Sequence, residues 1–159
     1  MSQLKVNSII PVGGVASGAG GGVIQVVSAH TSNKTTTNST TYQDISGLSL
    51  NLTPLSSSSK VIILVNVTIQ HTTVSDAGLF SLARIVGGTT TRPSDHPSVT
   101  MTNQLHNGAE LSGLFTHSAH FLDSPNTTSQ INYKYQVWHY SSSFGNIIVG
   151  GRTAEMPQT

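Results

Sequence analysis

The sequence predicts an all-β fold: a jelly-roll-like, two-sheet antiparallel sandwich that follows an extended N-terminal arm. The dominant pattern is an alternation of apolar and polar residues with a period of two, seven or more strands are predicted, and no stretch has the three-and-four spacing of an amphipathic helix. Short strands joined by long polar connections are typical of a two-sheet sandwich. A chain of 159 residues fits one domain. We place an arm and hinge at residues 1–22 and the sandwich at residues 23–159.

The arm carries apolar residues within its first ten positions and then becomes rich in glycine. Leu4, Val6, Ile9 and Ile10 cannot all be buried by so short a segment alone. An alternating arm can add a strand to the sheet edge of another chain, where main-chain hydrogen bonds supply affinity. These four residues are therefore predicted to anchor the protein to a partner. The glycines of residues 13–22 are predicted to form a hinge rather than a dinucleotide loop, because a strand follows them and not a helix.

The predicted strands follow along the chain. In Leu48–Thr53, leucines alternate with polar residues, which indicates one buried face. Lys60–His71 is apolar on both faces at its start, which favours a central position in a sheet. Prolines and an Asn-Gly pair break up Thr89–Gly108, which is predicted to be a long irregular excursion. The other predicted strands are Val23–His30, Leu79–Val86, Leu111–Asp123, Ile131–Tyr140 and Asn146–Val149.

Four aromatic residues gather in the strand Ile131–Tyr140. Side chains alternate between the faces of a strand, so Tyr133 and Tyr135 share one face, and Trp138 and Tyr140 share the other. We expect one of these faces to pack in the core and the other to form a subunit interface. All four aromatic residues are candidates for that interface. A sugar-stacking platform on the exposed face is the alternative.

Composition argues against several classes of function. Only 8% of the residues are charged, against about 25% in an average domain. The seven basic residues are scattered and form no patch that could follow a phosphate backbone, so no nucleic-acid partner is expected. The longest apolar run, Val61–Val65, is far shorter than the ~20 residues of a membrane span, so no membrane partner is expected.

The sequence also predicts no enzyme, no catalytic residue, no metal and no cofactor. His117 and His120 are three residues apart, which sends the two rings to opposite faces of a strand and disfavours a shared metal ion. His106 with Glu110, and Asp95 with His96, are the other pairs that could meet. There is no cysteine and no Gly-x-Ser-x-Gly motif, and most of the six acidic residues fall at strand ends or in loops.

Three stretches resemble a group of small virion proteins of tailed bacteriophages, above all marine and cyanobacterial ones. They are SQLKVNSIIPVGG at residues 2–14, the run from GVIQVVSAH to VIILVNVTI at residues 22–69, and FLDSPNTTSQINYKYQVW at residues 121–138. Residues 81–90 are similar to the arginine-containing strand of that group. The resemblance covers most of the chain and includes no catalytic motif. It implies a jelly-roll-like homotrimer on the particle exterior, assembled in the host cytoplasm. The ending GGRTAEMPQT departs from that group, where another alternating strand often closes the fold, so a neighbouring subunit is an alternative source of the last strand.

The expected function is therefore that of a non-catalytic virion protein. Fibre proteins usually have a long shaft between their anchor and their head, and no such shaft is visible here. This favours a capsid decoration or cement protein, bound to the major capsid protein, over a tail fibre. The alternative is a tail- or head-fibre knob, held by a tail or vertex protein, that binds a host-surface glycan. Its contact zone would be the excursion at residues 89–108, with Arg92, Asp95, His96 and His106. A bacterial lectin-like sandwich is disfavoured because no export signal is visible.

Overall fold

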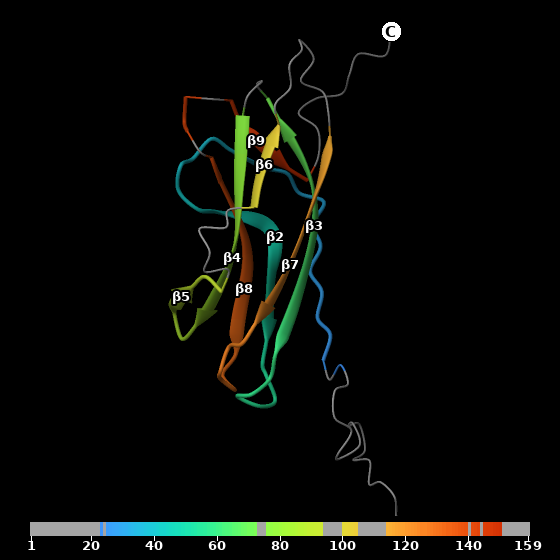
Figure 1. Cartoon of the computed structure of the whole chain (residues 1–159), viewed down its shortest axis with the longest axis vertical. Helices are drawn as coiled ribbons and strands as arrows, with labels where there is room; N and C mark the ends of the chain where they lie inside the picture. The colour runs from blue at the N-terminus through green and yellow to red at the C-terminus, as the bar shows by residue number, and fades with distance from the viewer. Residues whose placement is uncertain are drawn as a thin grey trace, which may run out of the picture.

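A computed structural model describes residues 23, 25–72, 76–93, 100–104, 114–139, 141–143 and 145–150 of the chain. Its strands are joined by turns and irregular segments (Figure 1). They are β1 (Thr35–Thr37), β2 (Gln43–Leu52), β3 (Val61–His71), β4 (Asp76–Val86), β5 (Thr89–Thr91), β6 (Thr100–Gln104), β7 (Phe115–Asp123), β8 (Ile131–His139) and β9 (Ile147–Val149).

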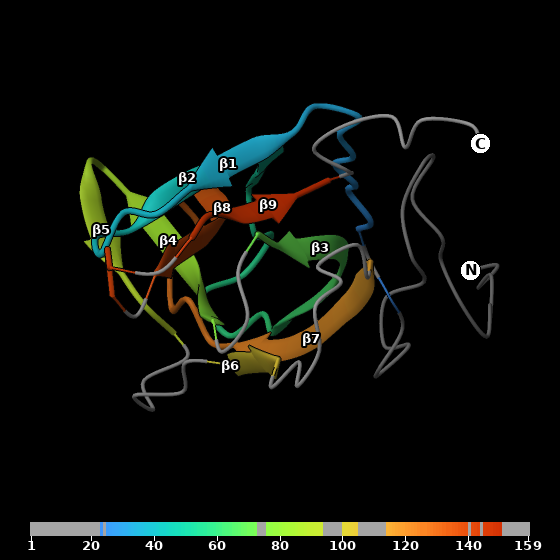
Figure 2. The same ribbon diagram turned by 90° about the horizontal axis from the view of Figure 1, so that it is seen from above.

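The strands form two antiparallel sheets that pack face to face, and Figure 2 shows the two layers from above. Sheet A has the order β1-β9-β3-β7. Sheet B has the order β2-β8-β4-β5, and β6 pairs with β4 as well. Apart from the short β5, this is the strand order of an eight-stranded jelly roll, in which the chain passes back and forth between the sheets. The predicted two-sheet antiparallel jelly-roll sandwich is confirmed.

The longest pairings set the frame of each sheet. In sheet A, β3 pairs with β7 from Val61↔Asp123 to Ile69↔Phe115 without a register shift. In sheet B, β4 pairs with β8 from Gly78↔His139 to Val86↔Ile131. Because the side-chain period of a strand is two, an unbroken register keeps each apolar set on one face along the whole strand.

The core lies between the sheets and contains side chains from both. Phe80 on β4 is fully buried and stacks on His117 of β7 and on Tyr135 of β8, with ring centroids 4.4 and 5.7 Å apart. Aromatic contacts of this kind add to the burial of apolar area. The buried apolar cluster comprises Ile45, Leu52, Val67, Ile69, Phe80, Leu82, Ile131, Tyr133, Tyr135, Val137, Ile147 and Val149.

Two predictions about local structure are wrong. The strand predicted at Val23–His30 is absent among its described residues, Val23 and 25–30, and the first strand is instead Thr35–Thr37. The excursion predicted at Thr89–Gly108 contains two strands, β5 and β6. These threonine-rich segments lack apolar alternation, and each is a strand because the edge of β4 supplies its hydrogen-bonding partner.

Candidate interaction surfaces

Sheet A turns a set of side chains away from the core along its two longest strands. We call this set the β3–β7 face. On β3 and β7 every second residue points outward, and across the ladder Ile62 lies opposite Leu122 and Leu64 opposite His120. Directly opposed side chains on one face are close neighbours. The face comprises Ile62, Leu64, Asn66, Thr68, Thr116, Ser118, His120 and Leu122.

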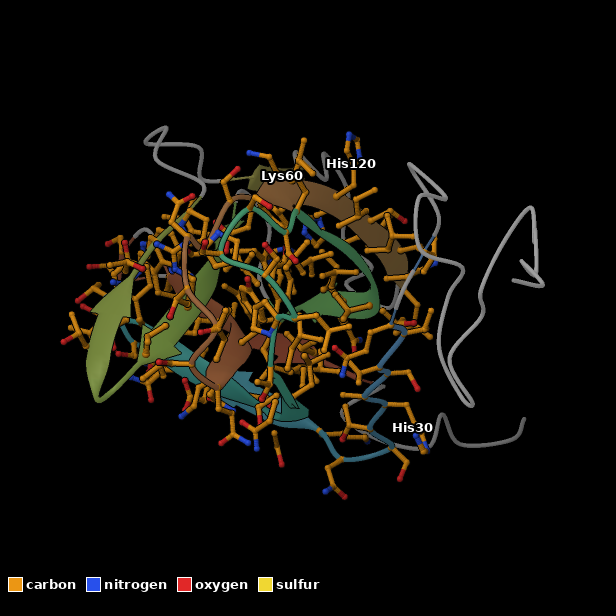
Figure 3. The ribbon with its side chains drawn as sticks, turned by 90° about the horizontal axis from the view of Figure 1, so that it is seen from below. His30, Lys60 and His120 are labelled. Carbon is orange, nitrogen blue, oxygen red and sulfur yellow. The ribbon has the colours of Figure 1, made fainter. Side chains whose placement is uncertain are left out.

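The apolar members of the β3–β7 face are open to solvent. The exposed fractions are 71% for Ile62, 79% for Leu64 and 67% for Leu122. None of the eight residues is acidic, lysine or arginine. His120 projects from β7 away from the body of the protein (Figure 3). Clustered apolar side chains that remain exposed on a folded domain mark a surface that binds a partner.

The outward face of sheet B differs, because its β4 residues are covered. Leu79, Ser81 and Ala83 alternate with the core residues of β4 and point away from the core, yet all three are buried. Each lies next to an outward-facing residue of β8. In sheet B, the outward side chains of β4 are therefore covered by other parts of the same chain. The outward apolar side chains of the β3–β7 face in sheet A are not covered.

Arg92 anchors the chain that follows β5 against sheet B. Its guanidinium lies 3.6 Å from the centre of the Tyr42 ring, and its Nη2 donates a 3.1 Å hydrogen bond to Gln136 Oε1. Tyr42 in turn meets Trp138 edge to face, with ring centroids 4.4 Å apart. We call Tyr42, Arg92, Gln136 and Trp138 the Arg92 cluster. A cation over an aromatic ring contributes about 0.5–2 kcal/mol, depending on its exposure.

An ion pair borders the Arg92 cluster. Lys134 Nζ donates to Asp44 Oδ2, and Gln136 Nε2 donates to Asp44 Oδ1 at 2.7 Å. Burial alone would raise the pKa of Asp44, but the two hydrogen bonds and the ammonium charge outweigh it and hold this pKa below its usual value. Asp44 is therefore a carboxylate at neutral pH, and Gln136 connects it to Arg92.

A buried ionic contact joins the two sheets. Asp123 of β7 accepts a 2.7 Å hydrogen bond from Arg84 Nη1 and a 2.6 Å bond from the Tyr133 hydroxyl. Burial and the neighbouring carboxylate raise the pKa of Tyr133, so its hydroxyl stays protonated and donates. Asp123, Arg84 and Tyr133 come from three different strands, so the contact holds sheet A against sheet B.

His117 is a further polar group of the interior with a described partner. Its Nε2 and the Tyr135 hydroxyl oxygen are 2.7 Å apart, and its ring stacks on Phe80. Burial lowers the pKa of His117 and raises that of Tyr135, so both groups are neutral at pH 7. His117 is a core residue, whereas His120 lies on the opposite face, as their spacing predicts.

The predicted site residues fall into three groups. Tyr133 and Tyr135 are only 2% and 3% exposed and belong to the core, so they offer no surface to another subunit. Arg92 and Trp138 come together in the Arg92 cluster, although the sequence assigned them to a receptor loop and to a subunit interface. The remaining predicted residues lie outside the described part of the chain: Leu4, Val6, Ile9, Ile10, Asp95, His96, His106 and Tyr140.

Sequence reasoning missed the β3–β7 face. The signal was present, because Ile62 and Leu64 make the outward side of β3 apolar. That pattern predicts a central strand that is covered on both sides. β3 does lie between β9 and β7, but its outward side carries no cover. Leu122, on the next strand of the sheet, becomes part of the same patch only through the β3–β7 register.

Two features are not found in the described ranges. No group of three or more histidine and acidic side chains there could hold a metal ion. No helix of this part of the chain has the length and apolar character needed to cross a membrane.

Comparison of the chain with protein-family models, with curated proteins and with solved structures gives no match in any of the three.

Proposed function

We propose that this protein is a non-catalytic structural protein of a bacteriophage virion, a trimeric decoration or cement protein on the exterior of the capsid. The exposed β3–β7 face is the observation that carries the proposal. Ile62, Leu64 and Leu122 lie outside the core of the jelly roll, so these exposed side chains do not stabilise the fold of a single copy. Such a surface is explained by an assembly that buries it.

Two further observations support an assembly role. Jelly rolls are frequent in viral capsid domains, although they also occur in lectins, so the fold is support by analogy. The low charge of the chain means that many copies can be packed side by side without strong mutual repulsion. The resemblance of residues 2–14, 22–69 and 121–138 to small phage virion proteins points the same way.

Copy number per particle tests the proposed position. Purified particles are analysed by quantitative gel densitometry against the major capsid protein. A cement protein is present in hundreds of copies, and its loss lowers the temperature at which particles release their genome. A count of a few trimers would contradict the capsid position and move the protein to the tail or a vertex.

The N-terminal arm provides a separate test of attachment. Deletion of residues 2–12 removes Leu4, Val6, Ile9 and Ile10. We expect this variant to fold, because the buried apolar cluster is formed by residues between Ile45 and Val149, and to be missing from particles. Circular dichroism checks the fold and densitometry checks incorporation. Normal incorporation of the shortened chain would overturn the anchoring role.

A fibre knob that binds a host-surface glycan is the second candidate, and the Arg92 cluster favours it. Aromatic side chains next to hydrogen-bonding groups suit sugar binding, and Tyr42 is 43% exposed beside Trp138, Gln136 and Arg92. Trp138 is the only tryptophan of the chain, so its fluorescence reports directly on this cluster. Titration with purified host-surface polysaccharide should shift that emission, and Tyr42→Ala should abolish the shift while the fold remains intact. An unchanged emission at saturating polysaccharide would exclude this candidate.

A further inference from the structure

We propose that the β3–β7 face is covered by the N-terminal segment of a second copy of the chain, made of Val23 and residues 25–30, which we call the valine segment. This inference rests on the proposed assembly function and names the partner of the face. Each copy would give its valine segment to one neighbour and receive that of another. Such head-to-tail contacts close into a ring when the rotation between copies allows it.

The composition of the face favours a copy of the same chain as the partner. Its eight residues carry no lysine, arginine or carboxylate, although Lys60 and Asp123 lie at its lower border. Lys60 bonds to Ser124, and Asp123 points into the core. Val23 and residues 25–30 likewise include no lysine, arginine, aspartate or glutamate. An uncharged face therefore suits an uncharged segment, because no charged group has to be removed from water.

The valine segment is an unpaired strand former. Val23 and Val26 are 80% and 79% exposed, and valine is among the residues that favour strands. Yet these residues form no strand, and none of the described backbone–backbone hydrogen bonds involves them. The donor segment and the acceptor face are therefore both uncovered in a single copy.

The valine segment leaves the β3–β7 face of its own chain open. Its C-terminal end is fixed to the sandwich, where Thr31 packs against Gly47 and Asn33 lies against Gly150. From there it runs beside β3 (Figure 1), and its His30 points away from the body (Figure 3). Ile62, Leu64 and Leu122 nevertheless stay exposed in the single copy.

The length of the valine segment also matches the length of the β3–β7 face. Eight extended residues, 23–30, span at most ~29 Å. The nine paired residues of β3 and β7 extend over about 30 Å. One valine segment is therefore long enough to lie along nearly the whole face of a neighbour.

Cysteine cross-linking between separate chains tests the contact, and the chain contains no cysteine of its own. Full-length Val26→Cys is mixed with full-length, tagged Leu64→Cys, and the mixture is oxidised mildly and separated on a non-reducing gel. We expect the mixed disulfide dimer as the main product. Tagged Leu55→Cys is the matched control, because Leu55 is a leucine of similar exposure, 74%, in the turn between β2 and β3. Its mixed dimer should be several-fold weaker.

The double variant Val26→Cys/Leu64→Cys separates the two ways of covering the face. A disulfide within one chain, seen as a monomer of altered mobility, would show that the segment covers its own face and would overturn the proposal. Equal cross-linking of Leu64→Cys and Leu55→Cys would overturn it too. In a parallel measurement, sedimentation velocity of Leu64→Glu should give the 16.7 kDa monomer where the unaltered chain gives a multiple of that mass, with Leu55→Glu unchanged.

These outcomes are independent of the virion. If the mixed dimer forms but purified particles lack the protein, the proposed function fails and the contact between copies stands. If particles contain the protein but no mixed dimer forms, the contact fails and the assembly role stands, with the β3–β7 face then left for a different virion protein.

Discussion

At the scale of single residues, polar groups in the interior fix the orientation of one sheet on the other. Asp123 and His117 both belong to β7, and each binds a tyrosine of β8 across the core. A buried polar group costs free energy unless it is hydrogen-bonded, so these contacts are favourable only when the two sheets are in register. The tyrosines that the sequence offered as interface candidates thus orient one sheet on the other.

Loss of the Asp123 carboxylate should weaken the fold strongly. Asp123→Ala leaves Nη1 of Arg84 and the Tyr133 hydroxyl without their described acceptor, in a site where the Asp123 side chain is 4% exposed. Removing one partner of a buried ion pair costs about 3–5 kcal/mol. Urea denaturation measures the loss. Asp44→Ala, which breaks the exposed pair with Lys134, is the control and should cost at most about 1 kcal/mol. Similar losses in the two variants would contradict the role of burial.

His117 should make the fold sensitive to mild acid. Its pKa is lowered in the folded state by burial, so below the unfolded value of about 6.5 the unfolded chain binds more protons than the folded one. Stability is therefore unaffected by His117 above that pH and falls as the pH drops below it, by at most about 1.4 kcal/mol per pH unit. Thermal unfolding at pH 7.5 and pH 5 measures the loss, and His117→Gln should lose less between these conditions. An equal loss would assign the acid sensitivity to other groups.

At the scale of elements, pairing partners decide which segments become strands. β1, β5 and β9 have three residues each, too few to be stable alone. β1 exists because it pairs with β9, and β9 pairs in turn with the end of β3. The valine segment has a stronger strand composition than β1, but none of the described strands pairs with it, which is why the prediction of a strand there fails.

The turn after β9 can be tested with a pair of glycines. Gly150 has φ +92°, and a Cβ there would lie 2.7 Å from the carbonyl oxygen of Asn33. Gly88 has φ +82° but no atom within 4 Å of the corresponding Cβ. Gly150→Ala should therefore lose more stability than Gly88→Ala, whose cost is only the backbone strain of about 1–3 kcal/mol. Chemical denaturation gives both values, and equal losses would mean that the Asn33 backbone moves away easily.

At the scale of the whole molecule, the two sheets share one core and differ in their outer faces. The inner faces meet at Phe80, whereas β4 of sheet B is covered on its outside and the β3–β7 face of sheet A is not. The molecule therefore has one outer face on which the central strand is covered and one on which apolar side chains are exposed. The proposed assembly uses the second face and leaves Tyr42 of the Arg92 cluster exposed on the first.

Truncation of Phe80 should destabilise both sheets together. Phe80 is fully buried between rings of β7 and β8, and a phenylalanine-to-alanine change in a core costs about 3–5 kcal/mol. Trp138 fluorescence reports on sheet B, and fluorine NMR of fluorophenylalanine at Phe121 reports on sheet A. We expect both probes to shift to the same lower urea midpoint. Separate midpoints would show that the sheets unfold independently, and Leu55→Ala, an exposed change, should move neither.

The amino-acid sequence by itself determined the fold class and most strands of this protein. Alternation in segments such as Leu48–Thr53 and Ile131–Tyr140 is a local property, and it correctly assigned Tyr133 and Tyr135 to one face of a strand. The tertiary structure decided which faces are covered and which distant residues meet. Arg92 reaches Tyr42 and Trp138, and Leu122 joins Ile62, only because the jelly-roll order sets their strands side by side. An apolar residue carries the same hydrophobicity whether it is buried or exposed, so no local pattern could show that the outside of β3 is left open.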